Sequence, residues 1–145
     1  MAFDYLSFRQ TLCRHYRQHF AALREETGLS QSEIELLLFL AAEPVADTAS
    51  AFSGARQMAK SRVSAVVDSL EGRGYLQRVR DPQNRRLVHL CLTPQGRALA
   101  SPLGDCKTAF WRSALTGISA EERRELYAIL QKIQKNAERD PLPPQ

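Results

Sequence analysis

Apolar residues recur at helical spacing along most of the chain. Between residues 77 and 92, apolar and polar residues alternate instead. The helical spacing predicts four helices before that interval, over residues 3–26, 30–42, 48–58 and 60–71. Alternating residues on both sides of a turn at 81–84 predict a hairpin with strands at 77–80 and 87–92. Helical spacing then returns over residues 93–115, with a bend or an interruption expected at Ser101–Pro102, and over residues 118–137.

Local start and stop signals support several of these boundaries. Gly28 can adopt the left-handed conformation that closes the first helix. Ser30 and Glu33 have the spacing of a capping box, in which each side chain accepts a hydrogen bond from the other residue's backbone. Ser119 and Glu122 repeat this spacing before the last helix. We therefore expect sharp helix starts at both places.

The order of the elements indicates how the chain is divided. Residues 29–99 contain three helices and the hairpin, which is the order of a winged helix-turn-helix with a two-stranded wing. The helix at 30–42 is apolar on most sides and should be the buried centre. Residues 1–28 and 100–139 are amphipathic but have no second core, so they predict a helical dimerisation region built from both chain ends. We expect residues 140–145 to be a disordered tail, and the fold class to be mainly α (α+β).

The helix at 60–71 has two unlike faces. Val63, Val66, Val67 and Leu70 form its apolar face. The opposite face of its first two turns carries small and polar residues, namely Ser61, Arg62, Ser64 and Ala65. Small residues allow a helix backbone to approach base edges, and Arg and Ser can bond to bases or phosphates. Asp68 is out of place on such a surface unless a basic side chain neutralises it.

Composition and charge narrow the function classes. The net charge is +4 and the sequence pI is about 9.2, which permits nucleic-acid binding without requiring it. The basic excess is concentrated between Arg56 and Arg97, where Lys and Arg outnumber the acids. The three cysteines are far apart and no Cys/His cluster has metal-ligand spacing, so no metal or cofactor is expected. No catalytic triad, paired carboxylates or phosphate loop can be assembled, so an enzyme is not expected.

Targeting signals are not evident. The first residues lack a basic stretch followed by a long apolar run, and no apolar run approaches the length of a membrane span. We therefore expect a cytoplasmic protein that does not enter a membrane.

The segment from Asn84 to Gly96 resembles the wing signature of the MarR (multiple-antibiotic-resistance regulator) family of winged-helix transcription factors. The positions that fall on the family's pattern are Arg86, Leu90, Leu92, Thr93 and Gly96. Asn84 departs from it, because the family usually has Asp there. The segment from Lys60 to Leu76 is similar to the family's recognition helix and its exit, and the element order agrees over almost the whole chain.

This resemblance implies roles for individual residues. Five residues would lie in or beside the major groove, namely Lys60, Ser61, Arg62, Ser64 and Ala65. Arg85, at the wing tip, would reach the minor groove of double-stranded DNA. Arg86 would pair with Asp68 and brace the wing against the recognition helix, which would account for the misplaced acid.

The resemblance also implies places where a signal could act. Small aromatic ligands bind some family members between the dimer helices and the winged domain, and the residues expected there are Tyr16, Phe20, Phe110 and Trp111. An aromatic dimer core is the alternative for these side chains. Cys13 lies in the first helix, where some members sense peroxide, and Arg14 and Arg17 could lower its pKa. The alternative is that Cys13 is a small core residue.

The sequence thus predicts a homodimeric regulator that binds a palindromic operator, with repression relieved by a ligand or by oxidation. A winged-helix module that binds another protein and not DNA is the competing hypothesis. The arginines around the wing argue against that alternative.

Overall fold

The computed structural model describes residues 2–42 and 45–139. The chain divides into two compact units, the first ending at Phe110 and the second beginning at Trp111. The predicted tail at 140–145 and the predicted helix end at Glu43–Pro44 lie outside the described residues. Within the described part, no helix combines the length and the hydropathy needed to cross a membrane.

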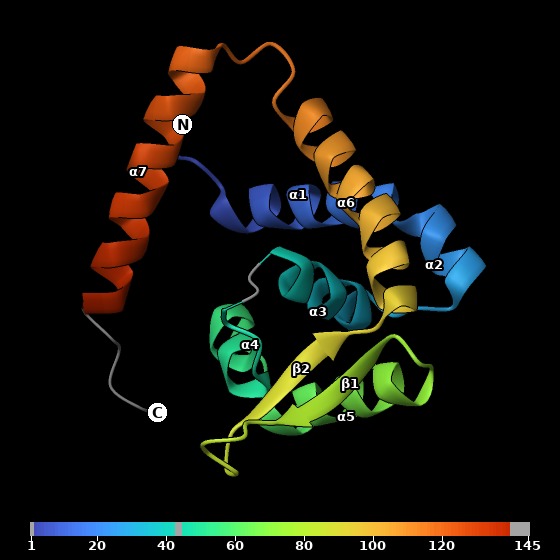
Figure 1. Cartoon of the computed structure of the whole chain (residues 1–145). Helices are drawn as coiled ribbons and strands as arrows, with labels where there is room; N and C mark the ends of the chain where they lie inside the picture. The colour runs from blue at the N-terminus through green and yellow to red at the C-terminus, as the bar shows by residue number, and fades with distance from the viewer. Residues whose placement is uncertain (1, 43–44, 140–145) are drawn as a thin grey trace. The chain divides into compact units, whose positions relative to one another are not determined.

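The first unit contains helices and one antiparallel sheet of two strands, as the sequence predicts (Figure 1). Its elements in order are α1 (Tyr5–His19), α2 (Ala21–Thr27), α3 (Gln31–Ala42), α4 (Ala49–Arg56), α5 (Lys60–Gly72), β1 (Leu76–Arg80), β2 (Val88–Leu92) and most of α6 (Pro94–Ala114). Mainly helical architecture with a two-stranded wing is therefore the observed fold class.

Helix α3 is the centre of the hydrophobic core. Five consecutive apolar residues of α3, from Leu36 to Leu40, are buried on all sides of the helix. Phe52 of α4 and the apolar face of α5 pack against them, and Leu90 and Leu92 of β2 complete the cluster. This confirms the prediction that the helix at 30–42 is the buried centre.

The capping predictions are confirmed. Ser30 N–H donates to Glu33 Oε2 at 2.7 Å, and Glu33 N–H donates to Ser30 Oγ at 3.2 Å. Gly28 closes α2 with a φ of 69°, in the left-handed region. These interactions involve residues at most four positions apart, so the local sequence is sufficient to specify them.

The prediction of one continuous helix over residues 3–26 is wrong. The helix is interrupted at Phe20, which lies between α1 and α2 with φ −101° and ψ −3°. Phe20 N–H donates to the carbonyl of Arg17, three residues back, so the last turn of α1 tightens. The break allows the Phe20 ring to be fully buried in the core.

Of the bend or interruption predicted at Ser101–Pro102, the interruption is wrong, because α6 runs through Pro102. A proline inside a helix removes one backbone hydrogen bond and costs about 3 kcal/mol. Ala100 and Leu103, on either side of it, are buried in the core. Their burial offsets this cost, an effect that the local sequence does not reveal.

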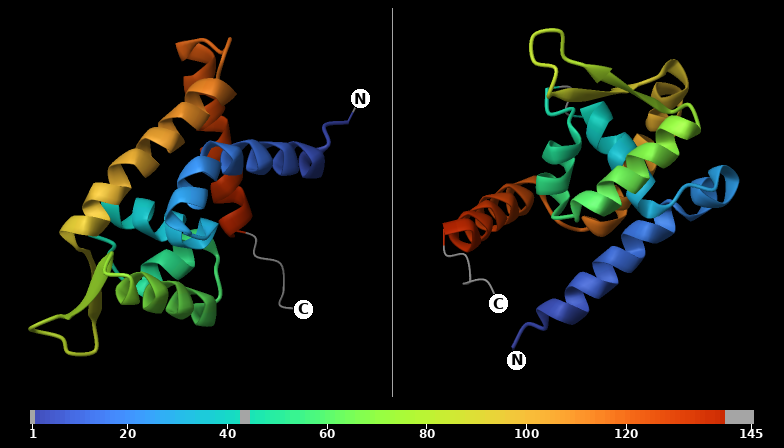
Figure 2. Two further views of the ribbon diagram at one scale, coloured as in Figure 1. Left: turned by 90° about the vertical axis from the view of Figure 1, so that its right-hand side faces the viewer. Right: turned by 90° about the horizontal axis from the view of Figure 1, so that it is seen from below.

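The wing hairpin has a regular register. Leu76 pairs with Leu92, Arg78 with Leu90, and Arg80 with Val88. The strands are one residue longer at the start of β1 and one shorter at the start of β2 than predicted. The loop between them projects beyond α4 and α5 in two different views (Figure 2).

The second unit contains the end of α6, a turn at Gly117 and α7 (Ala120–Arg139). Ser119 and Glu122 form the predicted capping box, with distances of 2.7 and 3.2 Å. Arg123 closes the turn by donating to the carbonyls of Leu115 and Ile118. No described residue of α7 is buried within the chain.

Candidate nucleic-acid interface

The residues predicted to read DNA lie together on the exposed side of α5. Val63, Val66, Val67 and Leu70 are buried against the core. The opposite side of the first two turns is exposed and carries the five predicted residues, Lys60, Ser61, Arg62, Ser64 and Ala65. The faces of the helix are therefore divided as the 3.6-residue period predicts, and a polar helix surface is available to a duplex.

Arg62 is held at one end of this surface. Its guanidinium donates to Ser32 Oγ, in the first turn of α3, at 3.0 Å. Arg62 also shares a shallow hollow with Ser30, Ala65 and Ser69 between the two helices. This arrangement points Arg62 back across the helix-turn-helix rather than straight outward, which suits contact with a phosphate more than contact with a base edge.

Glu33 links α3 to α5 and to the residue that follows it, Arg73. Its carboxylate accepts a hydrogen bond from Ser69 Oγ at 2.6 Å and lies 4.0 Å from an Arg73 nitrogen. Burial acts to raise the pKa of Glu33, but the hydrogen bonds from Ser69 and Ser30 prevail and lower it. Glu33 therefore remains charged and stabilises the packing of α5 on α3 as well as capping α3.

The partner of Asp68 differs from the prediction. Asp68 pairs with Arg78 of β1 at 2.6 Å, and Arg78 also pairs with Glu71, so the predicted pairing with Arg86 is wrong. Arg78 lies in the middle of β1, beside the last turns of α5, whereas Arg86 lies in the loop beyond the last paired residues, Arg80 and Val88. The brace between recognition helix and wing thus exists, but a strand arginine supplies it.

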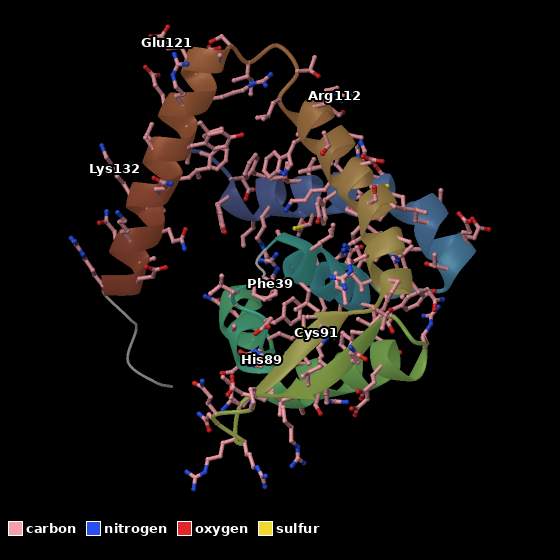
Figure 3. All side chains as sticks on the ribbon, in the orientation of Figure 1. Phe39, His89, Cys91, Arg112, Glu121 and Lys132 are labelled. Atoms are coloured by element: carbon pink, nitrogen blue, oxygen red, sulfur yellow. The ribbon has the colours of Figure 1, made fainter. Side chains whose placement is uncertain are left out.

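The wing tip is organised by Asp81. Its Oδ1 accepts hydrogen bonds from the backbone N–H groups of Gln83 and Asn84, both at 2.8 Å. Asn84 Oδ1 accepts a hydrogen bond from the N–H of Arg86 at 3.2 Å, so the amide that replaces the family's usual acid still closes the turn. Arg85 and Arg86 are exposed, and nitrogen-bearing side chains extend from the loop (Figure 3).

The sequence did not single out two residues of the wing base, Asp47 and His89. His89 Nδ1 lies 2.7 Å from Asp47 Oδ1, and His89 Nε2 lies 3.0 Å from Asp81 Oδ2. The two carboxylates lie 42 and 8 residues from His89 in the sequence, so no local pattern could identify them as its partners. Within residues 2–42 and 45–139, no group of three His, Cys, Asp or Glu residues could hold a metal ion.

Three of the predicted pocket residues form one aromatic cluster in the first unit. The Tyr16 ring lies 4.9 Å from Phe20 and 5.0 Å from Phe110. Burial, and then Glu35, raise the pKa of the Tyr16 hydroxyl, which therefore stays protonated. Trp111 belongs to the second unit, so its place in the predicted pocket stays a prediction.

Cys13 lies on the exposed side of α1 and is therefore not part of the core of this chain. It shares a hollow of about 250 Å³ with Gln10 and three arginines, Arg9, Arg14 and Arg17. By contrast, Cys106 is half-buried, and burial followed by the nearby Asp105 raises its pKa. Cys13 is thus more accessible to an oxidant than Cys106.

Comparison with known proteins agrees with this geometry. The family model described as "MarR family" matches residues 21–87, which contain α2 to α5 and the first strand of the wing. The chain is 32% identical over 111 residues to the uncharacterised HTH-type transcriptional regulator YdgJ of Bacillus subtilis, covering 76% of this chain and 66% of that protein. It spans 54% of the length of a second regulator from the same organism.

Solved structures share the fold. A transcriptional regulator of the MarR family from Silicibacter pomeroyi is 25% identical, with a TM-score of 0.77 over 89% of this chain and 86% of that one. The MepR–DNA complex of S. aureus has a TM-score of 0.80 over 92% and 96% of the two chains, at 20% identity. The wing signature, the observed winged helix-turn-helix and these matches together show that the chain belongs to the MarR family.

Proposed function

We propose that the protein is a homodimeric transcriptional regulator, acting as a repressor, that binds a palindromic DNA operator. The observation that carries this proposal is the exposed polar surface of α5 beside an arginine-tipped wing, in a chain of the MarR family. The surface of α5 from Lys60 to Ala65 enters the major groove, and Arg85 enters the adjacent minor groove. A related fold has been solved as a DNA complex, that of S. aureus MepR.

In this proposal, residues near the N-terminus and in α7 form the interface between the two subunits of a symmetric dimer. Large apolar side chains are exposed along α7, namely Leu126, Tyr127, Ile129, Leu130 and Ile133, and others near the N-terminus, namely Phe3, Tyr5, Leu6 and Phe8. Apolar surface of this extent is unusual on a monomer and supports an interface with a second copy. The dimer would place two recognition helices about one DNA turn, roughly 34–36 Å, apart.

The proposal is tested by DNA affinity and its salt dependence. Arg85→Ala should weaken binding to the DNA upstream of the protein's own gene by about tenfold and reduce the salt slope by about one, because one minor-groove cation is lost. Arg139→Ala removes an equal charge from the end of α7 and should leave both quantities unchanged. Fluorescence anisotropy at several salt concentrations measures them, and equal affinities for the two variants would contradict the assigned wing contact.

Relief of repression is the second part of the proposal. A small aromatic ligand binds beside the cluster of Tyr16, Phe20 and Phe110, or an oxidant converts the Cys13 thiol to a sulfenic acid among the neighbouring arginines. Either event changes the spacing of the two recognition helices and so favours the free state of the protein.

Peroxide distinguishes these routes. Treatment of the wild-type protein should weaken DNA binding about tenfold, and Cys13→Ser should abolish that effect. Cys106→Ser is the matched control, because Cys106 is half-buried and burial raises its pKa, which disfavours the reactive thiolate. If Cys13→Ser responds to peroxide as the wild type does, oxidation at this site is excluded and the ligand route remains.

A further inference from the structure

His89 joins two parts of the first unit that are distant in sequence. Its Nδ1 lies 2.7 Å from Asp47 Oδ1, and its Nε2 lies 3.0 Å from Asp81 Oδ2. The three side chains come from the segment before α4, from β2 and from the start of the wing loop. Figure 3 labels His89 on the ribbon of β2, on the same strand as Cys91.

The pair of contacts selects one protonation state. An ionised carboxylate can only accept hydrogen bonds, so both ring nitrogens of His89 must donate. Neutral imidazole has one N–H, and only the imidazolium can satisfy Asp47 and Asp81 at once. Charge-assisted hydrogen bonds of this kind are stronger than those between neutral groups.

Each carboxylate is itself tied to a structural element. The carbonyl of Asp47 accepts a hydrogen bond from the N–H of Leu90 at 2.7 Å, which docks this segment on β2, and the next residue, Thr48, caps α4. Asp81 uses its other oxygen to hold the N–H groups of Gln83 and Asn84. A continuous path of hydrogen bonds therefore runs from the start of α4 through His89 to the residue that precedes Arg85.

We propose that His89 is a positioning residue for the wing, which as an imidazolium bridging Asp47 and Asp81 holds the loop that presents Arg85 to DNA. This inference rests on the DNA contact proposed for Arg85. Loss of the proton breaks one of the two hydrogen bonds, releases the wing loop from the body of the winged domain and weakens DNA binding. The operator affinity of the protein is thereby made dependent on pH near neutrality.

The groups around His89 favour the charged ring. Hydrogen bonds to Asp47, and then to Asp81, raise the pKa of His89 above its ordinary value, and the bond to His89 lowers the pKa of Asp81. On β1, the side chains that share this face are Gln77 and Val79, which do not titrate. The thiol of Cys91 is the next ionisable group on the same face of β2.

Lys60 of α5 shares a hollow with Val88 and Leu90, which lie on the face of β2 opposite His89. Helix α4 has one ionisable residue, Arg56 at its far end, which pairs with Glu35 of α3 at 3.5 Å. Glu33, the other acid of α3, is occupied by Ser69 and Arg73. The charge state of His89 is therefore set by its two bridging carboxylates.

The sign of the pH dependence follows from these pKa shifts. The contribution of His89 is complete below its ordinary pKa of about 6.5 and is lost as the pH rises through the raised value. The contribution of Asp81 is present above its ordinary pKa and is lost only as the pH falls through a lower value. The wing is therefore held best in mildly acidic to neutral solution and loosens as the solution becomes alkaline.

A divalent metal ion is the alternative occupant for a set of two Asp and one His. The two carboxylates face opposite nitrogens of one ring, so they cannot converge on an ion held by either nitrogen alone. A metal ion would also require the neutral ring, so its binding would strengthen as the pH rises, which is the opposite pH dependence.

The test compares operator binding by full-length wild type, His89→Gln and Asp47→Asn from about pH 6 to about pH 9 at constant salt. Wild-type affinity should fall about fivefold more over this range than that of His89→Gln, which does not titrate. The affinity of Asp47→Asn should fall at lower pH than that of the wild type, because the His89 ring has lost one carboxylate.

In the Arg85→Ala background, His89→Gln should have no further effect on operator affinity. Amide exchange of residues 83–86 in the free wild-type protein should accelerate as the ring, followed by NMR, loses its proton.

Each failure has its own signature. Equal pH dependence in wild type and His89→Gln, while Arg85→Ala still weakens binding, would overturn the role of His89 and leave the DNA contact standing. No effect of Arg85→Ala would overturn the proposed wing contact itself. In that case the positioning role is tested by amide exchange alone. If the exchange of residues 83–86 does not change as His89 loses its proton, the positioning role is overturned as well. Chelator-sensitive affinity that increases with pH would show a metal site in its place.

Discussion

Replacing Gly96 with alanine should destabilise the protein by about 3 kcal/mol, the upper end of what overpacking usually costs. A Cβ atom at this position would lie 1.9 Å from the carbonyl oxygen of Tyr75 and 2.9 Å from its carbonyl carbon. Both are backbone atoms, so no side-chain rotation can relieve the overlap. The glycine is thus required by the close approach of two chain segments and not by its own backbone dihedrals.

The surrounding hydrogen bonds prevent an easy adjustment. The Tyr75 carbonyl accepts a hydrogen bond from the N–H of Thr93 at 3.1 Å, and Thr93 Oγ1 donates to the carbonyl of Gly74 at 2.6 Å. Gly96 N–H in turn donates to Thr93 Oγ1 at 3.1 Å, so the Thr93 side chain caps the first turn of α6. Moving Tyr75 away would therefore break the junction at which the base of the wing meets α6.

Gly104, in the same helix, is the matched control. A Cβ atom there would meet nothing within 4 Å, so Gly104→Ala should stabilise the helix by about 0.5–1 kcal/mol. Urea denaturation followed by circular dichroism measures both free energies of unfolding. If Gly96→Ala unfolds at the same urea concentration as Gly104→Ala, the close approach of Tyr75 to Gly96 is wrong.

Local patterns were sufficient to predict most of the helices and the hairpin of this fold. The capping box at Ser30 and Glu33 and the apolar face of α5 depend on residues within one or two helical turns, so their spacing specifies them. The break at Phe20 was not predictable in this way. Its helical neighbours continue the apolar stripe on both sides, and only burial of the ring in the core of the first unit explains the change of direction.

The details of the wing depend on strand register, which the sequence does not specify. Asp68 required a basic partner, and the family resemblance implied Arg86. The register places Arg78 opposite Leu90 and next to the end of α5, so Arg78 is the arginine within reach of Asp68. The same register places His89 beside Asp81. The hydrogen bond between His89 and Asp47 depends instead on tertiary packing, because Asp47 lies in the segment before α4.

A charge on the apolar stripe of α7 should have the largest effect on DNA binding. Leu126, Ile129, Leu130 and Ile133 lie within about 100° of one another around the helix, and each is 37–58% exposed in the single chain. Arginines, lysines and glutamates occupy much of the remaining surface. If this stripe is the proposed dimer interface, a substitution in it is present in both subunits, so two altered side chains are buried in each dimer.

Ile129→Glu should therefore convert the dimer to monomers and weaken operator binding by about 100-fold or more, because each half-site is then bound without its linked partner. Gln131→Glu places the same carboxylate on the polar side of α7 and should leave the dimer and its affinity unchanged. Sedimentation equilibrium gives the oligomeric state, and anisotropy on a full operator and on a half-site gives the affinities. The half-site affinity should be equal for the two variants, since α5 and the wing are untouched. A dimeric Ile129→Glu protein with full operator affinity would place the subunit interface elsewhere than on α7, and loss of half-site affinity would mean that the substitution disturbs the winged domain rather than the assembly.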